Sequence, residues 1–183
     1  MAAAPPVTSE ARYSRGARLL HWWTFASVAL AYLLTNLADL YERGTPLRRA
    51  LRQSHFLAGL VVLALVLPRL LHRLRNVPPP ILPPIATWEV HLSRLTHALL
   101  YGFIVLQPLL GLASVWFGGR GIGIPWTGLE MPSPLTENHD LHEQLEGIHG
   151  WIGTVFYYVM GLHIAGALWH HFVRHDSTLR RIL

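Results

Sequence analysis

The chain alternates between long stretches without charged residues and short clusters of charged ones. Asp, Glu, Lys and Arg are absent from four intervals, which hold 20, 16, 25 and 27 residues: 19–38, 53–68, 95–119 and 147–173. A helix needs about 20 residues to cross the hydrocarbon layer of a membrane. Arg69 and Arg73 follow the shortest interval, and their long side chains can reach outward to the head groups and lengthen that span. The pattern therefore predicts four membrane spans.

These spans predict an all-α integral membrane four-helix bundle that forms a single domain over residues 1–183. The predicted helices cover about 18–38, 53–73, 94–117 and 147–173. The connector from 76 to 88 contains five prolines, which exclude a helix and favour an extended chain. Residues 118–146 combine Gly, Pro and five acidic residues, which is typical of an irregular surface loop.

The composition agrees with a membrane protein, because 51% of the residues are hydrophobic and only 14% are charged. All 15 basic residues are arginine, and a basic chain can bind nucleic acid. Here the arginines flank apolar spans and form no separate basic domain, so we expect no nucleic-acid partner. Membrane lipid is the partner that this pattern requires.

The arginines also predict an orientation, because cytoplasmic ends of membrane spans carry the excess of basic residues. Ten arginines fall on the side of the termini: Arg12, Arg15, Arg18, Arg69, Arg73, Arg75, Arg94, Arg174, Arg180 and Arg181. Five fall on the other side: Arg43, Arg48, Arg49, Arg52 and Arg120. We therefore expect a multi-pass protein with both termini in the cytoplasm, although the cluster in the first loop opposes this count.

Twelve histidines are the main candidates for chemistry, since ionisable side chains inside a membrane are candidates for function. His149 and His163 lie 14 residues apart on the fourth predicted helix. At 1.5 Å and about 100° per residue, they are about 21 Å apart along the axis and about 40° apart around it. Two ligands on one stripe at opposite membrane depths suit two stacked haems.

Each haem iron needs a second ligand at the same depth. On the predicted topology, His21 is level with His163 on the cytoplasmic side, and His55 is level with His149 on the outer side. His97 lies at the depth of the inner pair and competes with His21 as its ligand, and spacing alone leaves both open. We expect most of the remaining histidines to be interfacial side chains without a ligand role, with His139 and His142 in the outer loop.

The predicted haems are non-covalent, because the chain has no cysteine and so no thioether attachment site. Two imidazoles fill both axial positions of an iron, which favours electron transfer over oxygen binding. Glycines near the four histidines would allow a flat macrocycle to approach the backbone, although glycine is also common in ordinary helix contacts. They are Gly59, Gly147, Gly150, Gly153, Gly161 and Gly166.

Several motifs resemble those of the bacterial cytochrome b561 family, and the resemblance runs from about Tyr13 to the C-terminus. They are YSRGARLLHWW, VLPRLLHRL, PPPILPP, LTHALLYGFIVLQPLLGL, IHGWIG, GLHIAGALWHH and DSTLRR. This chain departs in two features from the family members that are nearest in pattern. Those members have a pair of histidines where this chain has Arg94 and His97, and their N-terminus is shorter.

The resemblance implies two haem b groups, with iron ligation by His21 and His163 in the inner site and by His55 and His149 in the outer site. It favours His21 over His97. It also implies an inner-membrane location and electron transfer between an extracytoplasmic donor and ubiquinone. In the nearest family members the donor is superoxide, and the anion would be attracted by the positive charge of the first loop.

Three arginines are candidates to pair with haem propionates, since a guanidinium matches a carboxylate: Arg69, Arg73 and Arg180. Membrane topology alone also explains them. Two alternative functions stay open at this stage. One is a haem-bearing membrane anchor subunit of a dehydrogenase or hydrogenase, and the other is a histidine-rich metal transporter without haem.

Overall fold

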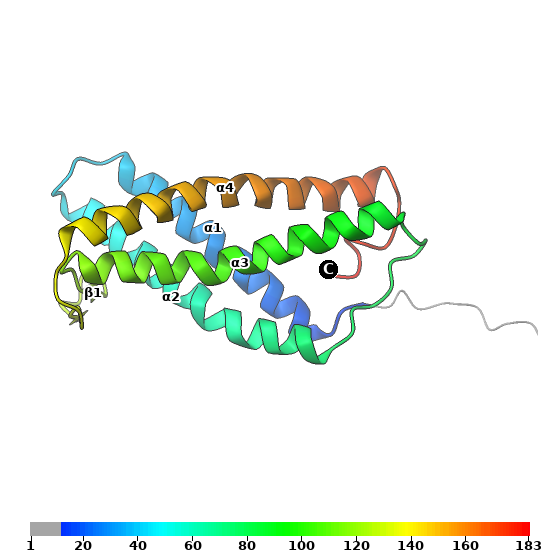
Figure 1. The fold of residues 1–183 in the computed structure, drawn as a ribbon, viewed down its shortest axis with the longest axis horizontal. Coiled ribbons are helices and arrows are strands. Elements are labelled where there is room, and N and C mark those ends of the chain that lie inside the picture. Colours follow the sequence, from blue (N-terminus) through cyan, green and yellow to red (C-terminus); the bar gives the residue numbers. More distant parts are fainter. Residues whose placement is uncertain (1–11) are drawn as a thin grey trace, which may run out of the picture.

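The computed structural model describes residues 12–183, so the first eleven residues of the predicted domain lie outside the described residues. Four helices run alternately up and down: α1 (Arg15–Asp39), α2 (Pro46–Arg75), α3 (Thr87–Phe117) and α4 (His139–Phe172). Residue 12 and the C-terminus lie at the same end of the bundle (Figure 1). We call this the terminal end, and the opposite end, formed by the first and third loops, the loop end.

The helices begin where side chains cap them, and α2, α3 and α4 each begin at least seven residues earlier than the sequence predicts. Thr45 caps α2 by accepting a hydrogen bond from the Arg48 amide, and Pro46 follows at the first helical position. Asn138 caps α4 by accepting from the Leu141 amide. The prediction of an irregular segment is therefore wrong for residues 139–146, which are helical because this cap starts α4 two turns early.

The bundle is built from two helical hairpins, in which α1 packs along α2 and α3 packs along α4. The hairpins contact each other most closely through α2 and α3. Every helix contributes to one buried apolar cluster near mid-height: Val28, Val62, Val66, Ile104 and Phe156. This cluster holds the four helices together and separates the two ends of the bundle.

Within residues 12–183, the helices long and apolar enough to cross a membrane are α2, α3 and α4. The prediction of a span is thus supported by length and composition for these three. Helix α1 has 25 residues, which is long enough, but His21, two tryptophans and Asn36 reduce its apolar character. Large apolar side chains such as Leu33, Leu67 and Leu162 are exposed on the outside, as expected where lipid replaces water.

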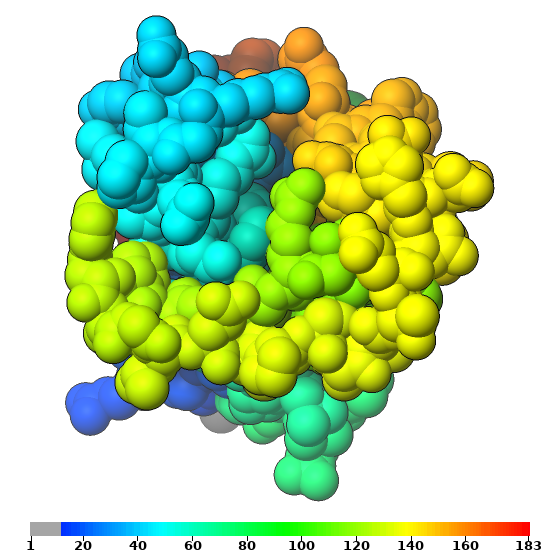
Figure 2. Space-filling model, turned by 90° about the vertical axis from the view of Figure 1, so that its left-hand side faces the viewer, coloured from blue at the N-terminus to red at the C-terminus, as the bar shows by residue number. Residues whose placement is uncertain are grey.

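A short hairpin in the third loop covers part of the loop end. Its strands β1 (Ile122–Gly123) and β2 (Glu130–Met131) pair antiparallel. Gln53 on α2 fastens it, donating to the Gly121 carbonyl and accepting from the Gly123 amide at 2.8 Å. Figure 2 shows this end, with the third loop lying below the first loop and the start of α4.

Candidate functional site

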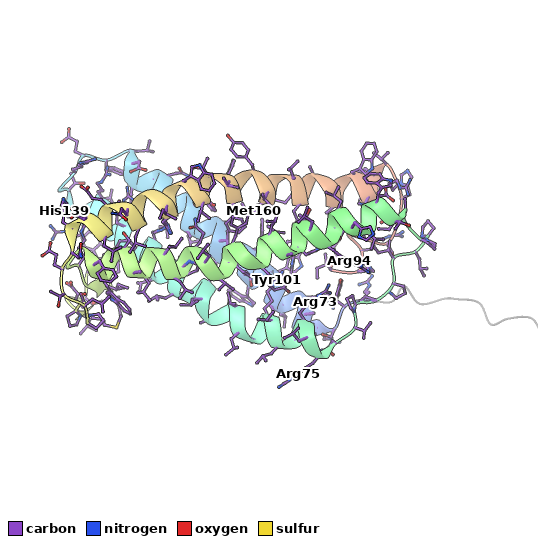
Figure 3. All side chains as sticks on the ribbon, viewed as in Figure 1. Arg73, Arg75, Arg94, Tyr101, His139 and Met160 are labelled. Carbon is purple, nitrogen blue, oxygen red and sulfur yellow. The ribbon has the colours of Figure 1, made fainter. Side chains whose placement is uncertain are left out.

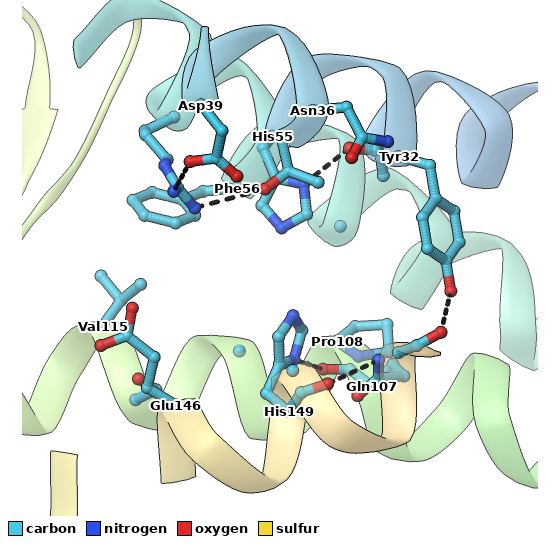
Figure 4. Close-up of a pocket in the computed structure, with 18 of the residues that line it drawn as sticks. Tyr32, Asn36, Asp39, His55, Phe56, Gln107, Pro108, Val115, Glu146 and His149 are labelled. Atoms are coloured by element: carbon cyan, nitrogen blue, oxygen red, sulfur yellow. Dashed lines mark hydrogen bonds and ion pairs between the residues drawn. The ribbon is translucent and has the colours of Figure 1, made fainter. Parts of the chain in front are cut away.

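A cavity of about 1200 Å³ opens at the loop end, and His55 and His149 lie on its walls. His55 comes from α2 and His149 from α4, and the two rings project toward each other from opposite sides (Figure 4). Their centroids are 6.2 Å apart, with the ring planes at 87°. The structure thus brings together the two side chains that the sequence assigned to the outer site.

Hydrogen bonds fix how these two rings are protonated. The Nδ1 atom of His55 lies 2.9 Å from the Ala31 carbonyl, and that of His149 lies 3.1 Å from the Gln107 carbonyl. A carbonyl oxygen only accepts, so each Nδ1 must carry the proton and donate it. The Nε2 atoms of both rings then present a lone pair to the cavity, as metal-ligating histidines do.

Glycines shape this cavity in two ways. A Cβ added at Gly111 would lie 3.1 Å from the His149 ring, so the absence of a side chain there lets the ring take its place. At Gly59 and Gly150, which line the cavity, a Cβ would meet no atom within 4 Å. The open space beside these two glycines fits a flat macrocycle. Gly153 differs, because its Cβ would collide with the Gln107 amide nitrogen.

The arginines that the sequence analysis assigned to the first loop lie on the wall of the same cavity, and the early start of α2 makes all of them except Arg43 part of this helix. Arg48 and Arg52 both bind the carboxylate of Asp39, at 3.2 and 2.7 Å. Arg43, Arg49 and Arg120 also line the cavity. The arginines that were expected to attract an anionic donor therefore line this cavity, together with two carboxylates, Asp39 and Glu146.

A second cavity, of about 800 Å³, lies at the terminal end, and five histidines line it, among them His21, His97 and His163. The ring centroid of His163 on α4 is 6.5 Å from that of His21 on α1 and 5.4 Å from that of His97 on α3. The Nδ1 of His97 donates to the Ser93 carbonyl at 2.6 Å. Both of the inner candidates left open by the sequence are thus present at this site.

Arg69 donates a hydrogen bond to the ring of His21. Its Nη2 lies 3.1 Å from the His21 Nδ1, its Nη1 donates to the Leu20 carbonyl, and its guanidinium covers the Tyr101 ring at 5.5 Å. An arginine only donates, so in this arrangement the His21 Nδ1 accepts and the Nε2 carries the proton. The His21 Nε2 can act as a ligand only after Arg69 releases Nδ1.

Two of the three predicted propionate arginines, Arg69 and Arg73, line this cavity. Arg180 is exposed, and it is not among the lining residues. Its neighbour Arg181 is buried and lines the cavity instead. The sequence analysis counted Arg181 only for topology, because nothing in the local pattern shows how the C-terminal segment folds back.

Other histidines form local contacts. His142 is buried, and its Nδ1 bonds to the Ser114 carbonyl at 2.8 Å. His170 pairs with Asp176, and His72 bonds to the Ser14 hydroxyl. His142 was expected in the outer loop, and the early start of α4 explains its burial. Among residues 12–183, no group of three or more His, Asp or Glu side chains is arranged to hold a metal ion.

The chain is a membrane-spanning helical bundle in which imidazole rings face each other beside open cavities. This arrangement is typical of membrane-bound b-type cytochromes. The chain belongs to the prokaryotic cytochrome b561 family, whose sequence profile matches residues 12–183. This family implies haem b as the cofactor, and the paired rings and glycine-lined space described above fit such a group.

Two relatives match nearly the whole chain. Cytochrome b561 homolog 1 of Escherichia coli (strain K12) is 29% identical over 174 residues, which cover 94% of this chain and 97% of that protein. A protein from Yersinia pestis named probable superoxide oxidase CybB is 31% identical over 166 residues, covering 90% of this chain and 91% of that protein. The family and its membrane electron-transfer role are therefore established for this chain.

Proposed function

We propose that this chain is a di-haem b-type cytochrome that transfers electrons from superoxide at the loop end to membrane ubiquinone. In this proposal His55 and His149 hold the outer haem, and His21 and His163 hold the inner one. Each bound haem supplies a one-electron redox centre. The observation that carries the proposal is the pairing of imidazoles across both cavities at similar separations.

The separations agree with bis-imidazole ligation. With metal–imidazole bonds of about 2 Å, two rings in line on opposite sides of one metal have centroids about 6.4 Å apart. The His55–His149 and His21–His163 separations are 6.2 and 6.5 Å. The His97–His163 separation of 5.4 Å is too short for a metal between the rings, and this supports His21 as the inner ligand.

A single apolar layer separates the two proposed haem sites. Phe156 stacks on Phe103 with centroids 5.0 Å apart, and Tyr101 and Met160 pack against the same cluster. Figure 3 labels Tyr101 and Met160 in the middle of the bundle, between the two ends. Close packing excludes water from this layer and keeps the two sites at a constant separation, so electron transfer between them needs no moving part.

The proposed direction follows from charge. The positive-inside rule supports a cytoplasmic terminal end in the bacterial inner membrane, and this places the loop end outside. The arginines around the loop-end cavity then attract an anionic donor. Superoxide is further supported by the relative named probable superoxide oxidase. Two superoxide anions each lose one electron to become oxygen, and one ubiquinone gains two electrons and two protons.

The alternatives are less well supported. An anchor subunit would use the same histidines but would accept electrons from a partner protein rather than from a small anion. A metal transporter needs a cluster of metal ligands, and residues 12–183 contain no such group of three or more. The arginines that line the cavity beside the His55–His149 pair favour a small anionic donor over either alternative.

The test is to purify the full chain in detergent and measure haem b per chain by pyridine haemochrome, with a dithionite-reduced difference spectrum. We expect two haem b groups per chain, and a result of none or one contradicts the proposal. The same preparation is then supplied with a superoxide source and a soluble ubiquinone. We expect ubiquinol to form, and to stop forming when a dismutase removes the superoxide. Two haems without ubiquinol formation would reject the donor and acceptor and leave the electron carrier.

A further inference from the structure

The C-terminal segment, residues 173–183, folds back over the terminal-end cavity. The Leu82 amide donates to the Ser177 hydroxyl, and the Ser177 amide donates to the Leu82 carbonyl at 2.9 Å. Arg18 donates to the Leu183 carbonyl at 2.6 Å, and the Trp22 indole donates to the Ile182 carbonyl at 3.1 Å. This segment therefore ties the proline connector to α1 and closes the cavity from the terminal end.

Arg181 is the charged side chain that this segment buries. It is only 7% exposed and lies on the wall of the cavity that holds His21 and His163. Its Nη1 donates to the Pro79 carbonyl, and its guanidinium covers the Tyr13 ring at 5.5 Å. Its Nε is buried without a hydrogen-bond partner.

No carboxylate forms an ion pair with Arg181 within the part of the chain that the structure describes. The arginines that do form ion pairs are more exposed than Arg181. Arg48 and Arg52 share Asp39, and Arg174 binds Glu89. Burial is costly for a cation, and it lowers the pKa of the Arg181 guanidinium, although the nearby Tyr13 side chain and Asp176 carboxylate counteract this in part. An anion inside the cavity would offset this cost.

A second buried polar atom lies in the wall of the same cavity. The Thr178 hydroxyl is buried and makes no hydrogen bond of good geometry, although it interacts with the Asp176 carboxylate, to which the Thr178 backbone amide donates. The two unsatisfied groups come from one turn of the C-terminal segment, three residues apart. A buried hydroxyl and a buried guanidinium on the wall of one cavity are donors suited to a carboxylate.

We propose that Arg181, assisted by Thr178, binds a propionate carboxylate of the inner haem, so that the C-terminal segment forms part of the haem-binding site. The inference rests on the inner haem of the proposed function. Arg181 takes the role that the sequence analysis gave to Arg180. The same donors could bind another anion, such as a lipid phosphate, so the test must separate the haem carboxylate from other sources.

The test compares Arg181→Gln with Arg180→Gln, a matched control whose side chain is exposed and outside the cavity. The full chain is loaded either with haem b or with its dimethyl ester, which lacks the carboxylates, and haem loss to an excess of apomyoglobin is followed. With haem b, we expect Arg181→Gln to lose one of the two haems about 10-fold faster than wild type. With the ester, wild type and Arg181→Gln should lose that haem equally fast.

Two outcomes would overturn the inference. If Arg181→Gln accelerates loss of the ester as much as loss of haem b, its role is structural or concerns another anion. If it changes neither, it has no role in haem binding. A potentiometric titration of the protein as purified gives a second readout, since removal of a nearby cation should lower the midpoint potential of one haem only. Wild type with fewer than two haems would instead reject the proposed function itself.

Discussion

The groups that hydrogen-bond to the rings of His55, His149 and His21 determine which ring nitrogen is available as a ligand. At the loop end, backbone carbonyls hold Nδ1 of both rings, and this leaves Nε2 available as a ligand. At the terminal end, Arg69 holds Nδ1 of His21, so that ligation there requires a rearrangement. A propionate could attract Arg69 away from the ring, because a carboxylate is the stronger acceptor for a guanidinium.

The choice between His21 and His97 can be tested by substitution. We expect His21→Ala and His163→Ala to remove the same haem, and His97→Ala to leave two haems per chain, because only the first pair has the separation that a metal needs. Haemochrome analysis and low-temperature difference spectra measure this. Loss of the inner haem in His97→Ala, with His21→Ala unaffected, would reverse the assignment.

Gly111 is expected to be essential for the outer site. A Cβ at this position would lie 3.1 Å from the His149 ring, so Gly111→Ala should displace the ring and weaken outer haem binding about 10-fold. Haem content and the spectrum of the remaining haem report the effect. Gly102→Ala on the same helix is the matched control, because a Cβ there meets nothing within 4 Å. Equal haem content in both variants would contradict the prediction.

Among the structural elements, the C-terminal segment depends on a buried carboxylate. Burial raises the pKa of Asp176, but hydrogen bonds from Thr178 and His170 outweigh it and hold this pKa below its ordinary value of 3.8. The ionised form is therefore favoured in the folded protein. Its contribution to stability is complete above pH 3.8 and is lost as the pH falls through the lower folded value.

This gives a pH-dependent prediction for Asp176→Asn. The variant should melt at a lower temperature than wild type from pH 7 down to about pH 4, and the margin should disappear at lower pH. Thermal unfolding of the detergent-solubilised protein, followed by circular dichroism, measures the margin. A margin that grows as the pH falls below 4 would mean that the ionised carboxylate does not stabilise the segment.

For the whole molecule, the uneven distribution of charge between the ends predicts a dependence on salt. Arg43 and Arg49 line the loop-end cavity and are exposed. Replacing both with glutamine should slow the reaction with superoxide several-fold at low ionic strength, and the difference should shrink as salt screens the charges, over about 10 Å at 0.1 M. Pulse radiolysis with detection of haem reduction measures the rate.

Arg75→Gln is the matched control for this prediction. Arg75 is also exposed, but it lies at the terminal end, away from the loop-end cavity (Figure 3). We expect this variant to react at the wild-type rate at every salt concentration. An equal decrease in both variants would indicate that net charge alone, rather than charge at the cavity entrance, attracts the donor.

The sequence by itself determined the number of helices, their order and the heights of His149 and His163 along the fourth helix. Uncharged intervals long enough to cross a membrane predict helices, and a constant rise per residue places His149 and His163 at opposite depths. A ligand partner must lie at the same depth in the membrane, which restricted the partner of His163 to His21 or His97 and the partner of His149 to His55. These properties depend only on distance along the chain, so the pattern of residues is sufficient to predict them.

Only the tertiary structure decided which groups meet around each cavity. Packing determines where α2 and α4 begin and which of two neighbouring arginines, Arg180 or Arg181, is buried. It also brings Asp39 to Arg52 and Arg69 to the His21 ring. Arg180 and Arg181 are adjacent residues of the same type, so the sequence alone does not distinguish them. Their directions differ because the C-terminal segment is held by distant residues, and contacts between residues far apart in the chain leave no local pattern in the sequence.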